Sequence, residues 1–436
     1  MGQVNQLPAD GRIRPMRNLS VPKILLAVGG LLLLTLLVYQ LPPVKQRLSW
    51  RLDFFMAYVR GVIYPVEPLP TPLPAAALAA ALTEPVPTPS ATIPPTPTST
   101  PKPGPTSTPL PSPTPLPDQV SLPAPAWEKQ DINNCGPAAL TMDLRYFGWE
   151  GDQYAISDLI KPVREDRNVN VEELVYFVRT RAGWLNAEYR VGGDLELLKQ
   201  LLAAGIPVMI EESFHFEEPY WPNDDLWAAH YQLLTGYDDS SETFTGQDSY
   251  YGPDQQIPYD ILDANWKIFN RVYILIYPPE QENQVKTILG PNWEVDANRQ
   301  HALEVAQAET EADAQDAFAW FNLGSNLVYF GRYGEAAHAY DQARTIGLPQ
   351  RMLRYQFGPF FAYFHSGRID ELTTVTEYAL ERTPNAEEAL LWRGWAYYRQ
   401  PEPDLNHAIE MWRKALEAHP DYQDALYALD FVGASP

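Results

Sequence analysis

The sequence predicts an α+β domain followed by an all-α repeat solenoid, with a single transmembrane helix near the N-terminus. Three observations predict this order: an uncharged apolar run over residues 24–41, a mixed globular stretch over residues 126–280, and a helical pattern that recurs over residues 296–433. The chain has 436 residues, which is enough for two or three domains.

The composition excludes several classes of function. The formal net charge is −23, whereas binding to a phosphate backbone needs clustered Lys and Arg, so we expect no nucleic-acid partner. The acidic balance instead favours cationic partners. A single cysteine permits neither an intrachain disulfide nor a zinc cluster built from thiolates. We therefore expect no cofactor and no metal.

The first predicted element is a membrane anchor. Residues 1–23 form a short tail with several Lys and Arg, and the Leu-rich run over 24–41 has about the length that crosses a hydrocarbon core. The run ends in Tyr-Gln-Leu-Pro-Pro, which lacks the small residues of a cleavage site, so an anchor is favoured over a signal peptide. Residues 42–62 mix basic and aromatic side chains and are expected to lie along the interface as an amphipathic helix.

The stretch over residues 63–125 is rich in Pro, Thr and Ser. Such a composition cannot build a packed core and predicts an extended, semi-rigid spacer. Lys and Arg flank the apolar run almost equally on both sides, so they do not indicate which way the predicted anchor crosses the membrane. We infer its orientation from the Pro-rich spacer, which we call the stalk. We expect a single-pass protein of the cell membrane, with the domains after the stalk outside the cytoplasm.

The stretch over residues 126–280 has the pattern of an α+β domain. Helical periodicity appears over 135–148, 171–183 and 194–205, and each of these segments ends in glycine. Strand patterns appear over 207–211, 230–237, 242–248 and 271–277. The helices come first and the strands cluster late, which is typical of an antiparallel sheet with helices packed on it.

The stretch over residues 296–433 repeats every 34–36 residues with the tetratricopeptide pattern. The first copy is carried by Trp320, Leu323, Gly324, Gly331, Ala336, Tyr340 and Ala343. Equivalent positions recur at Tyr363, Gly367, Ala379 and Pro384, then at Gly394, Tyr397, Ala408, Trp412, Ala415 and Pro420. Three or more units are what a stacked array needs for a continuous core, and we expect this one to bind a protein or peptide.

One short motif carries the chemistry. In "KQDINNCGPAAL", Cys135 begins a helix, whose unpaired N–H groups and partial positive charge stabilise a thiolate. Gln130 lies five residues upstream and, with the Cys135 backbone N–H, supplies donors for an oxyanion hole. The alternative is a buried, inert cysteine, the commoner fate of this residue. The surrounding Gln, Asn, Gly and Pro favour catalysis.

A thiolate nucleophile needs a base. Five of the seven histidines lie in the repeat region, which leaves His215 and His230. His215 lies in an acidic, aromatic stretch predicted as a loop. His230 is the first residue of a predicted strand, which would hold its side chain more rigidly, so it is the better candidate for the base.

Asp248 is predicted as the group that orients His230. If Gly236 pairs with Glu242 across a hairpin, Asp248 becomes the cross-strand partner of His230, with the two Cβ atoms roughly 5 Å apart. A carboxylate in that place accepts a hydrogen bond from the imidazole and fixes its tautomer. A slip of one residue in the register would break this argument.

The motifs "QDINNCGPAAL", "AAHYQLLTGYDD" and "GQDSYYGP" closely resemble the bacteriocin-leader (double-glycine) cysteine peptidases and their broader bacterial relatives, a papain-like family. The resemblance covers about residues 126–280. It implies that Cys135 is the nucleophile, His230 the base, Asp248 the orienting residue and Gln130 an oxyanion donor. The chain shows no nucleotide-binding transporter module, so cleavage after a double glycine is not implied.

The sequence thus predicts a membrane-anchored cysteine peptidase with a Cys-His-Asp triad, a peptide or protein substrate, and a repeat domain that is not needed for the chemistry. One alternative is a catalytically inactive papain-like scaffold that binds a protein or wall polymer. Another is a cell-wall peptide amidase, where the third polar group is often a second histidine.

Overall fold

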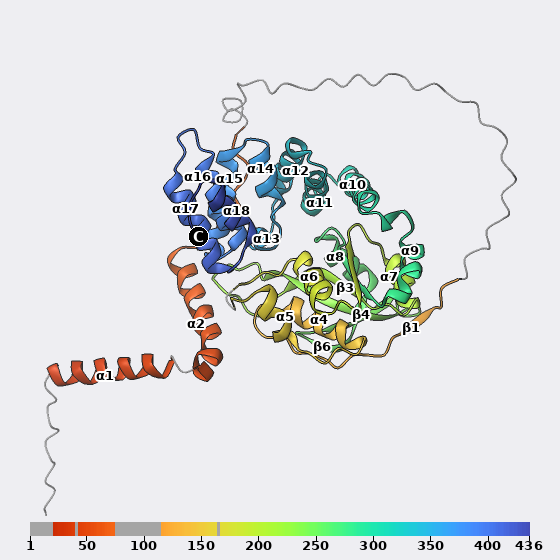
Figure 1. Cartoon of the computed structure of the whole chain (residues 1–436), viewed down its shortest axis with the longest axis horizontal. Coiled ribbons are helices and arrows are strands. Elements are labelled where there is room, and N and C mark those ends of the chain that lie inside the picture. Colours follow the sequence, from red (N-terminus) through yellow and green to blue (C-terminus); the bar gives the residue numbers. More distant parts are fainter. Residues whose placement is uncertain (1–20, 40–41, 75–114, 164–165) are drawn as a thin grey trace, which may run out of the picture. The chain divides into compact units, whose positions relative to one another are not determined.

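The computed structural model describes residues 21–39, 42–74, 115–163 and 166–436 (Figure 1). The chain divides into two compact units, Met1–Pro65 with Tyr220–Pro222, and Val66–Pro219 with Asn223–Pro436. Each unit is described by itself.

The first unit contains two helices, α1 (Val21–Tyr39) and α2 (Pro42–Ile63). Among the described residues, no helix combines the length and the apolar character that a membrane crossing requires. The transmembrane helix predicted over residues 24–41 therefore has no support in the structure, although a helix does form there. The segment predicted as amphipathic is also helical.

The second unit begins its globular part with one antiparallel sheet. Its strand order is β2-β7-β3-β4-β5-β6, and β1 pairs with β4 outside this path. The strands are β1 (Gln119–Ser121), β2 (Asn186–Arg190), β3 (Val208–His215), β4 (Trp227–Asp238), β5 (Thr243–Asp248), β6 (Gly252–Pro258) and β7 (Tyr273–Tyr277). The pairing of β1 with β4 draws the end of the Pro-rich stretch into the sheet.

Helices cover both faces of this sheet, as its alternating apolar side chains require. On β3 and β4, Met209 and Leu233 face the cluster that contains α4, α5 and α6, while Val208 and Leu234 face α7, α8 and α9. The helices are α4 (Cys135–Tyr146), α5 (Gln153–Ile160), α6 (Val171–Arg181), α7 (Leu195–Ala203), α8 (Tyr259–Lys267) and α9 (Glu282–Leu289). The predicted α+β architecture is confirmed.

Local sequence explains where these helices begin. The side chain of Asp152 accepts hydrogen bonds from the first backbone N–H groups of α5, and Asp194 does the same for α7. Asn170 and Glu173 form a reciprocal capping box at the start of α6.

The C-terminal stretch forms helical hairpins in tandem, as predicted. It comprises α10 (Val295–Ala312), α11 (Ala317–Tyr329), α12 (Tyr333–Ile346), α13 (Met352–Tyr355), α14 (Gly358–His365), α15 (Ile369–Arg382), α16 (Glu387–Tyr398), α17 (Leu405–Ala418) and α18 (Gln423–Phe431). The recurring glycines have a packing role. A Cβ at Gly324 would lie 2.7 Å from the ring of Tyr340, and one at Gly394 would lie 2.3 Å from that of Trp412. Each glycine lets an aromatic side chain of the next helix fill the hairpin.

The repeats pack against the α+β domain rather than standing apart from it. One buried apolar cluster runs from α4 and α6 into α11, α12 and α14. The buried Arg351 guanidinium joins the two parts through Asp224, with 2.6 Å between Nη2 and Oδ2. Lys267 and Asp316 add a second ion pair at 2.5 Å. Removing the repeats would therefore expose apolar surface of the α+β domain.

Candidate active site

Cys135 is the first residue of α4 and is half-buried. Asn133 has a φ of 55°, so the chain turns sharply before the helix begins. The thiol thus lies at the N-terminus of α4, where the first backbone N–H groups have no partner within the helix. Burial by itself raises the pKa of the Cys135 thiol. The contact with His230, the charge of that ring, the Tyr231 backbone N–H and the Lys161 ammonium outweigh burial and lower the pKa below its usual value.

His230 lies within β4 and is 3% exposed. Its Nε2 is 3.2 Å from Oδ1 of Asp248, although the ring N–H is not aligned for a hydrogen bond, so the contact is an ion pair. Burial alone would lower the pKa of His230, but the contacts with Asp248 and Cys135 and their negative charges raise it to about 10. Together the lowered thiol pKa and the raised imidazole pKa favour a thiolate–imidazolium pair.

Asp248 is held in place by the turn that follows β5. The backbone N–H groups of Tyr250 and Tyr251 donate to its Oδ1 at 2.6 and 2.9 Å, and the Trp127 indole N–H donates to its backbone oxygen at 2.8 Å. Burial raises the pKa of Asp248, but the His230 contact and these N–H groups outweigh it and lower the pKa. The carboxylate is therefore ionised and fixed beside the ring.

The predicted hairpin register is wrong, although the carboxylate that it selected does lie beside His230. Gly236 pairs with Thr245, not with Glu242, and Leu233 pairs with Gln247. Continuing from Leu233 places Asp248 opposite Gln232, two residues from His230 and on the same face of the sheet. Asp248 thus reaches His230 diagonally, a distance that long side chains span.

Gln130 is anchored by the residue that follows Asp248. Its backbone N–H donates to the Ser249 backbone oxygen at 3.0 Å, and the Ser249 hydroxyl donates to its Oε1 at 2.8 Å. With Oε1 held by Ser249, the Nε2 amide is the end of the side chain that can donate to a substrate.

Two further charged residues lie at this site and were not predicted. Lys161 follows α5 and is 4% exposed, and its Nζ donates to the backbone oxygen of Asn133 at 2.7 Å, just ahead of Cys135. Glu212 on β3 is the direct cross-strand partner of His230. Burial raises the pKa of Glu212 to about 7, with the positive charge of His230 opposing that rise and Asp248 adding to it. Neither residue belongs to a motif; the repeated Glu in "PVMIEESFH" was the only signal.

His215 is the last residue of β3, paired with Trp227, so its predicted loop position is wrong. It is exposed and stands three residues along the strand from Glu212, the partner of His230. Elsewhere in the described chain, Asp166, Glu387 and His419 bring one ligand atom each within 4.8 Å. His419 Nδ1 lies 3.3 Å from Glu387 Oε1, so this group pairs among its own members.

Residues 119–276 match the model of the Peptidase C39-like family. These residues form a C39-like cysteine peptidase domain. The resemblance expected from the sequence is therefore confirmed for this part of the chain, and no curated protein matches the chain.

Three solved structures are similar to parts of this chain. A putative C39-like peptidase from Bacillus anthracis is 18% identical, with a TM-score of 0.29, and the match covers 36% of this chain and 96% of that one. Xylellain, a cysteine protease from Xylella fastidiosa, is 16% identical, with a TM-score of 0.29 and coverages of 37% and 87%. YrrB, a tetratricopeptide-repeat protein with an unusual peptide-binding site, is 21% identical, with a TM-score of 0.18 and coverages of 30% and 84%.

Proposed function

We propose that this chain is a cysteine peptidase that hydrolyses peptide bonds through Cys135, His230 and Asp248. The Cys135 thiolate attacks the carbonyl carbon, and the Cys135 backbone N–H and the Gln130 amide stabilise the oxyanion. His230 donates its proton to the leaving amine and then takes one from the water that cleaves the thioester. Asp248 holds the ring in position throughout.

The observation that carries this proposal is the ion pair between His230 and Asp248 beside a thiol at a helix N-terminus. The His230 and Asp248 side chains are only 4% and 6% exposed, so little water screens their interaction. Burial without a partner would drive the imidazole to its neutral form and raise the pKa of the thiol. The ion pair instead keeps His230 and the thiol charged, as nucleophilic attack by a thiolate requires.

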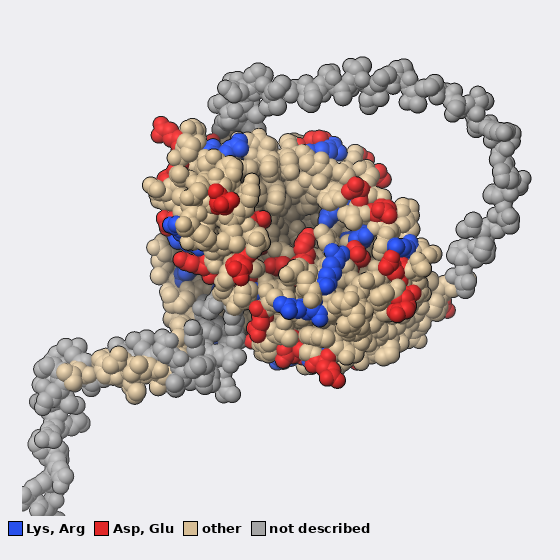
Figure 2. Space-filling view, in the orientation of Figure 1, with Lys and Arg blue, Asp and Glu red and all other residues tan. Residues whose placement is uncertain are grey.

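We propose that the repeats help to bind the substrate. A cavity of about 610 Å³ lies between the C39-like domain and the repeats, and Figure 2 shows a hollow with both acidic and basic residues around it. Its lining includes Tyr231, which follows His230 on β4 and points to the opposite face of the sheet. Six carboxylic acids line it against the single guanidinium of Arg299: Glu172, Glu173, Glu211, Glu387, Glu388 and Asp424. Burial raises the pKa of Glu173 to about 8 and raises the pKa values of Glu211, Glu387 and Glu388 well above the usual value, so these four carboxyl groups are largely protonated near neutral pH. The lining can therefore both donate and accept hydrogen bonds, which suits the amide groups of a polypeptide.

The test is turnover of a fluorogenic peptide library by the full chain and its histidine variants. His230→Ala should reduce kcat/KM by at least about 100-fold, because the nucleophile loses its base and the leaving amine its acid. His215→Ala is the matched control, an exposed histidine on the neighbouring strand, and should change turnover little. Loss of activity in His215→Ala with activity kept in His230→Ala would contradict the assignment.

We further propose that residues 24–41 attach the chain to the cell membrane, with both domains outside the cytoplasm. This part rests on the sequence alone, through the uncharged run and the Pro-rich stretch after it. Protease treatment of intact cells should release a fragment that begins in residues 63–125. Protection of the whole chain until the cells are lysed would reverse the topology.

A further inference from the structure

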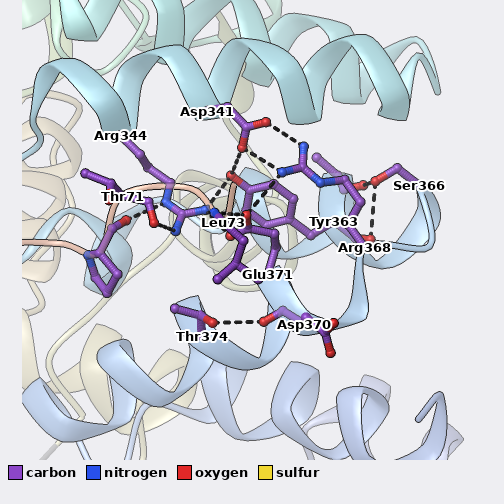
Figure 3. Close-up of polar contacts among 12 residues, drawn as sticks. Thr71, Leu73, Asp341, Arg344, Tyr363, Ser366, Arg368, Asp370, Glu371 and Thr374 are labelled. Atoms are coloured by element: carbon purple, nitrogen blue, oxygen red, sulfur yellow. Dashed lines mark hydrogen bonds and ion pairs between the residues drawn. The ribbon is translucent and has the colours of Figure 1, made fainter. Parts of the chain in front are cut away.

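The beginning of the Pro-rich stretch is docked on the repeats. Residues 67–73 lie against α12 and α15, where their backbone makes a set of polar contacts (Figure 3). Arg344 donates from Nε to the Pro70 backbone oxygen at 2.9 Å and from Nη2 to that of Thr71 at 3.3 Å. The Leu73 backbone N–H donates to Oε1 of Glu371 at 2.6 Å.

Two flanking contacts fix the N-terminal end of this segment. The Tyr378 hydroxyl donates to the Glu67 backbone oxygen at 3.1 Å. Leu69 is 6% exposed and belongs to the buried apolar cluster of the unit. The segment is therefore anchored by the apolar side chain of Leu69, and the residues that follow are bound through their backbone groups.

The receiving side chains form a connected polar network. Arg344 and Glu371 are each 1% exposed and form an ion pair at 2.7 Å. The Tyr363 hydroxyl accepts from Arg344 and donates to Asp341, and Asp341 pairs with Arg368. Figure 3 shows Arg344 and Glu371 beside Thr71 and Leu73, with Tyr363, Asp341 and Arg368 continuing the same network.

A buried ion pair is stable only if its remaining donors are also satisfied. The Pro70 and Thr71 carbonyls satisfy the Nε and Nη2 donors that Arg344 does not direct at Glu371 or Tyr363. The site thus has a fork of two donors and one acceptor that a peptide backbone completes.

The backbone donors and acceptors of the segment match the hydrogen-bonding groups of this site. Proline has no backbone N–H, so in "PTPLP" (residues 70–74) only Thr71 and Leu73 can donate. An extended Pro-rich strand leaves its carbonyls without internal partners. Two exposed carbonyls followed by one isolated N–H are the complement of the Arg344 fork and the Glu371 carboxylate.

We propose that Arg344 and Glu371 form a recognition site for extended proline-rich peptides, and that residues 66–74 are its resident ligand. The inference concerns the repeats and does not depend on peptidase activity. The ligand class is an extended Leu-Pro-Thr-Pro-Leu-Pro segment with a free N–H between two prolines. The four residues Thr-Pro-Leu-Pro at 71–74 recur at 108–111 and at 114–117, but these copies have Thr106 and Ser112 in the place of Leu69 and therefore lack the apolar anchor.

Docking of this segment changes how α2 is connected to the repeats. Only residues 64–66 separate the end of α2 from Glu67, the first docked residue. Release of the segment would leave roughly 50 residues before β1, a connection that reaches about 150 Å at ~3.1 Å per residue in an extended Pro-rich chain. Exchange of the resident ligand for an added peptide would therefore lengthen the tether.

The test changes the ligand and leaves the repeats intact. Leu73→Pro removes the backbone N–H of the segment that donates to Glu371 and keeps the segment proline-rich. Leu110→Pro makes the same change in the second Thr-Pro-Leu-Pro copy and is the matched control. The probe is a fluorescent peptide with the sequence of residues 66–74, added to each full-length chain and followed by fluorescence anisotropy.

The Leu73→Pro chain should bind this probe at least about 10-fold more tightly than the unchanged chain, because a tethered ligand competes at millimolar effective concentration. The Leu110→Pro chain should bind it like the unchanged chain, and a probe with proline in place of its Leu73 equivalent should bind weakly. Equal affinities of the Leu73→Pro and unchanged chains would overturn the proposal. So would equal affinity of the Leu73→Pro chain for the two probes.

Discussion

The charge of Asp248 should set the pH range over which the Cys135 thiol is reactive. Asp248→Asn removes that charge and keeps the shape of the side chain. A charge of opposite sign within ~4–6 Å moves a pKa by about 1–3 units, and Oδ1 is 3.2 Å from Nε2 of His230 in a buried setting. At about 1.4 kcal/mol per unit, the loss amounts to roughly 1.4–4 kcal/mol of preference for the imidazolium.

The direction of the change follows from the two shifted groups. In the unchanged chain His230 has a pKa of about 10, so the imidazolium persists up to that pH and helps to lower the pKa of Cys135. In Asp248→Asn, His230 loses its proton at lower pH, and the thiol pKa rises toward its ordinary value. The thiolate–imidazolium pair should then exist over a narrower pH range, because the pKa of the thiol sets its lower limit and rises, and the pKa of the imidazole sets its upper limit and falls.

Iodoacetamide labelling measured by intact mass reports this range, since the chain has one cysteine and each added mass identifies it. The labelling rate should show its lower midpoint at a higher pH in Asp248→Asn than in the unchanged chain. Asp238→Asn is the control, because Asp238 lies at the exposed turn end of β4 and contacts Ser240. Midpoints that agree within about 0.3 pH units in all three chains would refute the coupling between Asp248 and the thiol.

Two other predictions follow from the structure. Since the pKa of Glu212 is about 7, the pH dependence of peptide turnover should show an ionisation near that pH. Glu212→Gln should abolish this ionisation, whereas the control Glu218→Gln, at an exposed position, should leave it in place. An unchanged pH profile in Glu212→Gln would show that Glu212 does not act at the site. Gly324→Ala places a Cβ 2.7 Å from the Tyr340 ring and should reduce the free energy of unfolding by about 1–3 kcal/mol. The control is Gly334→Ala in the next helix, whose Cβ meets nothing within 4 Å and should not destabilise the protein. Equal melting temperatures for the two variants would contradict the packing argument.

The sequence by itself determined the local features of this protein. The Gly-Pro after Cys135 and the apolar periodicity that follows specify a helix that begins at the thiol, and α4 begins there. Alternating apolar residues gave the strands that carry His230 and Asp248, because the two faces of a sheet alternate along the chain. The recurring glycines gave the helical hairpins, because their spacing reflects packing within one repeat.

Only the tertiary structure decided what depends on partners distant in sequence. The register between β4 and β5 shifts at an irregularity between Leu234 and Gly236, which hairpin counting cannot locate, and Asp248 meets His230 diagonally as a result. Lys161 and Glu212 reach the site through packing of α5 and β3, for which no motif exists.

The Pro-rich stretch shows the same limit most clearly. Its composition predicts a spacer, and residues 67–73 nevertheless dock on the repeats. The contacts are made by backbone carbonyls and one N–H, and groups of this kind occur throughout residues 63–125, so composition does not show which residues dock. The buried Arg344 and Glu371 that receive them come together only when α12 and α15 pack.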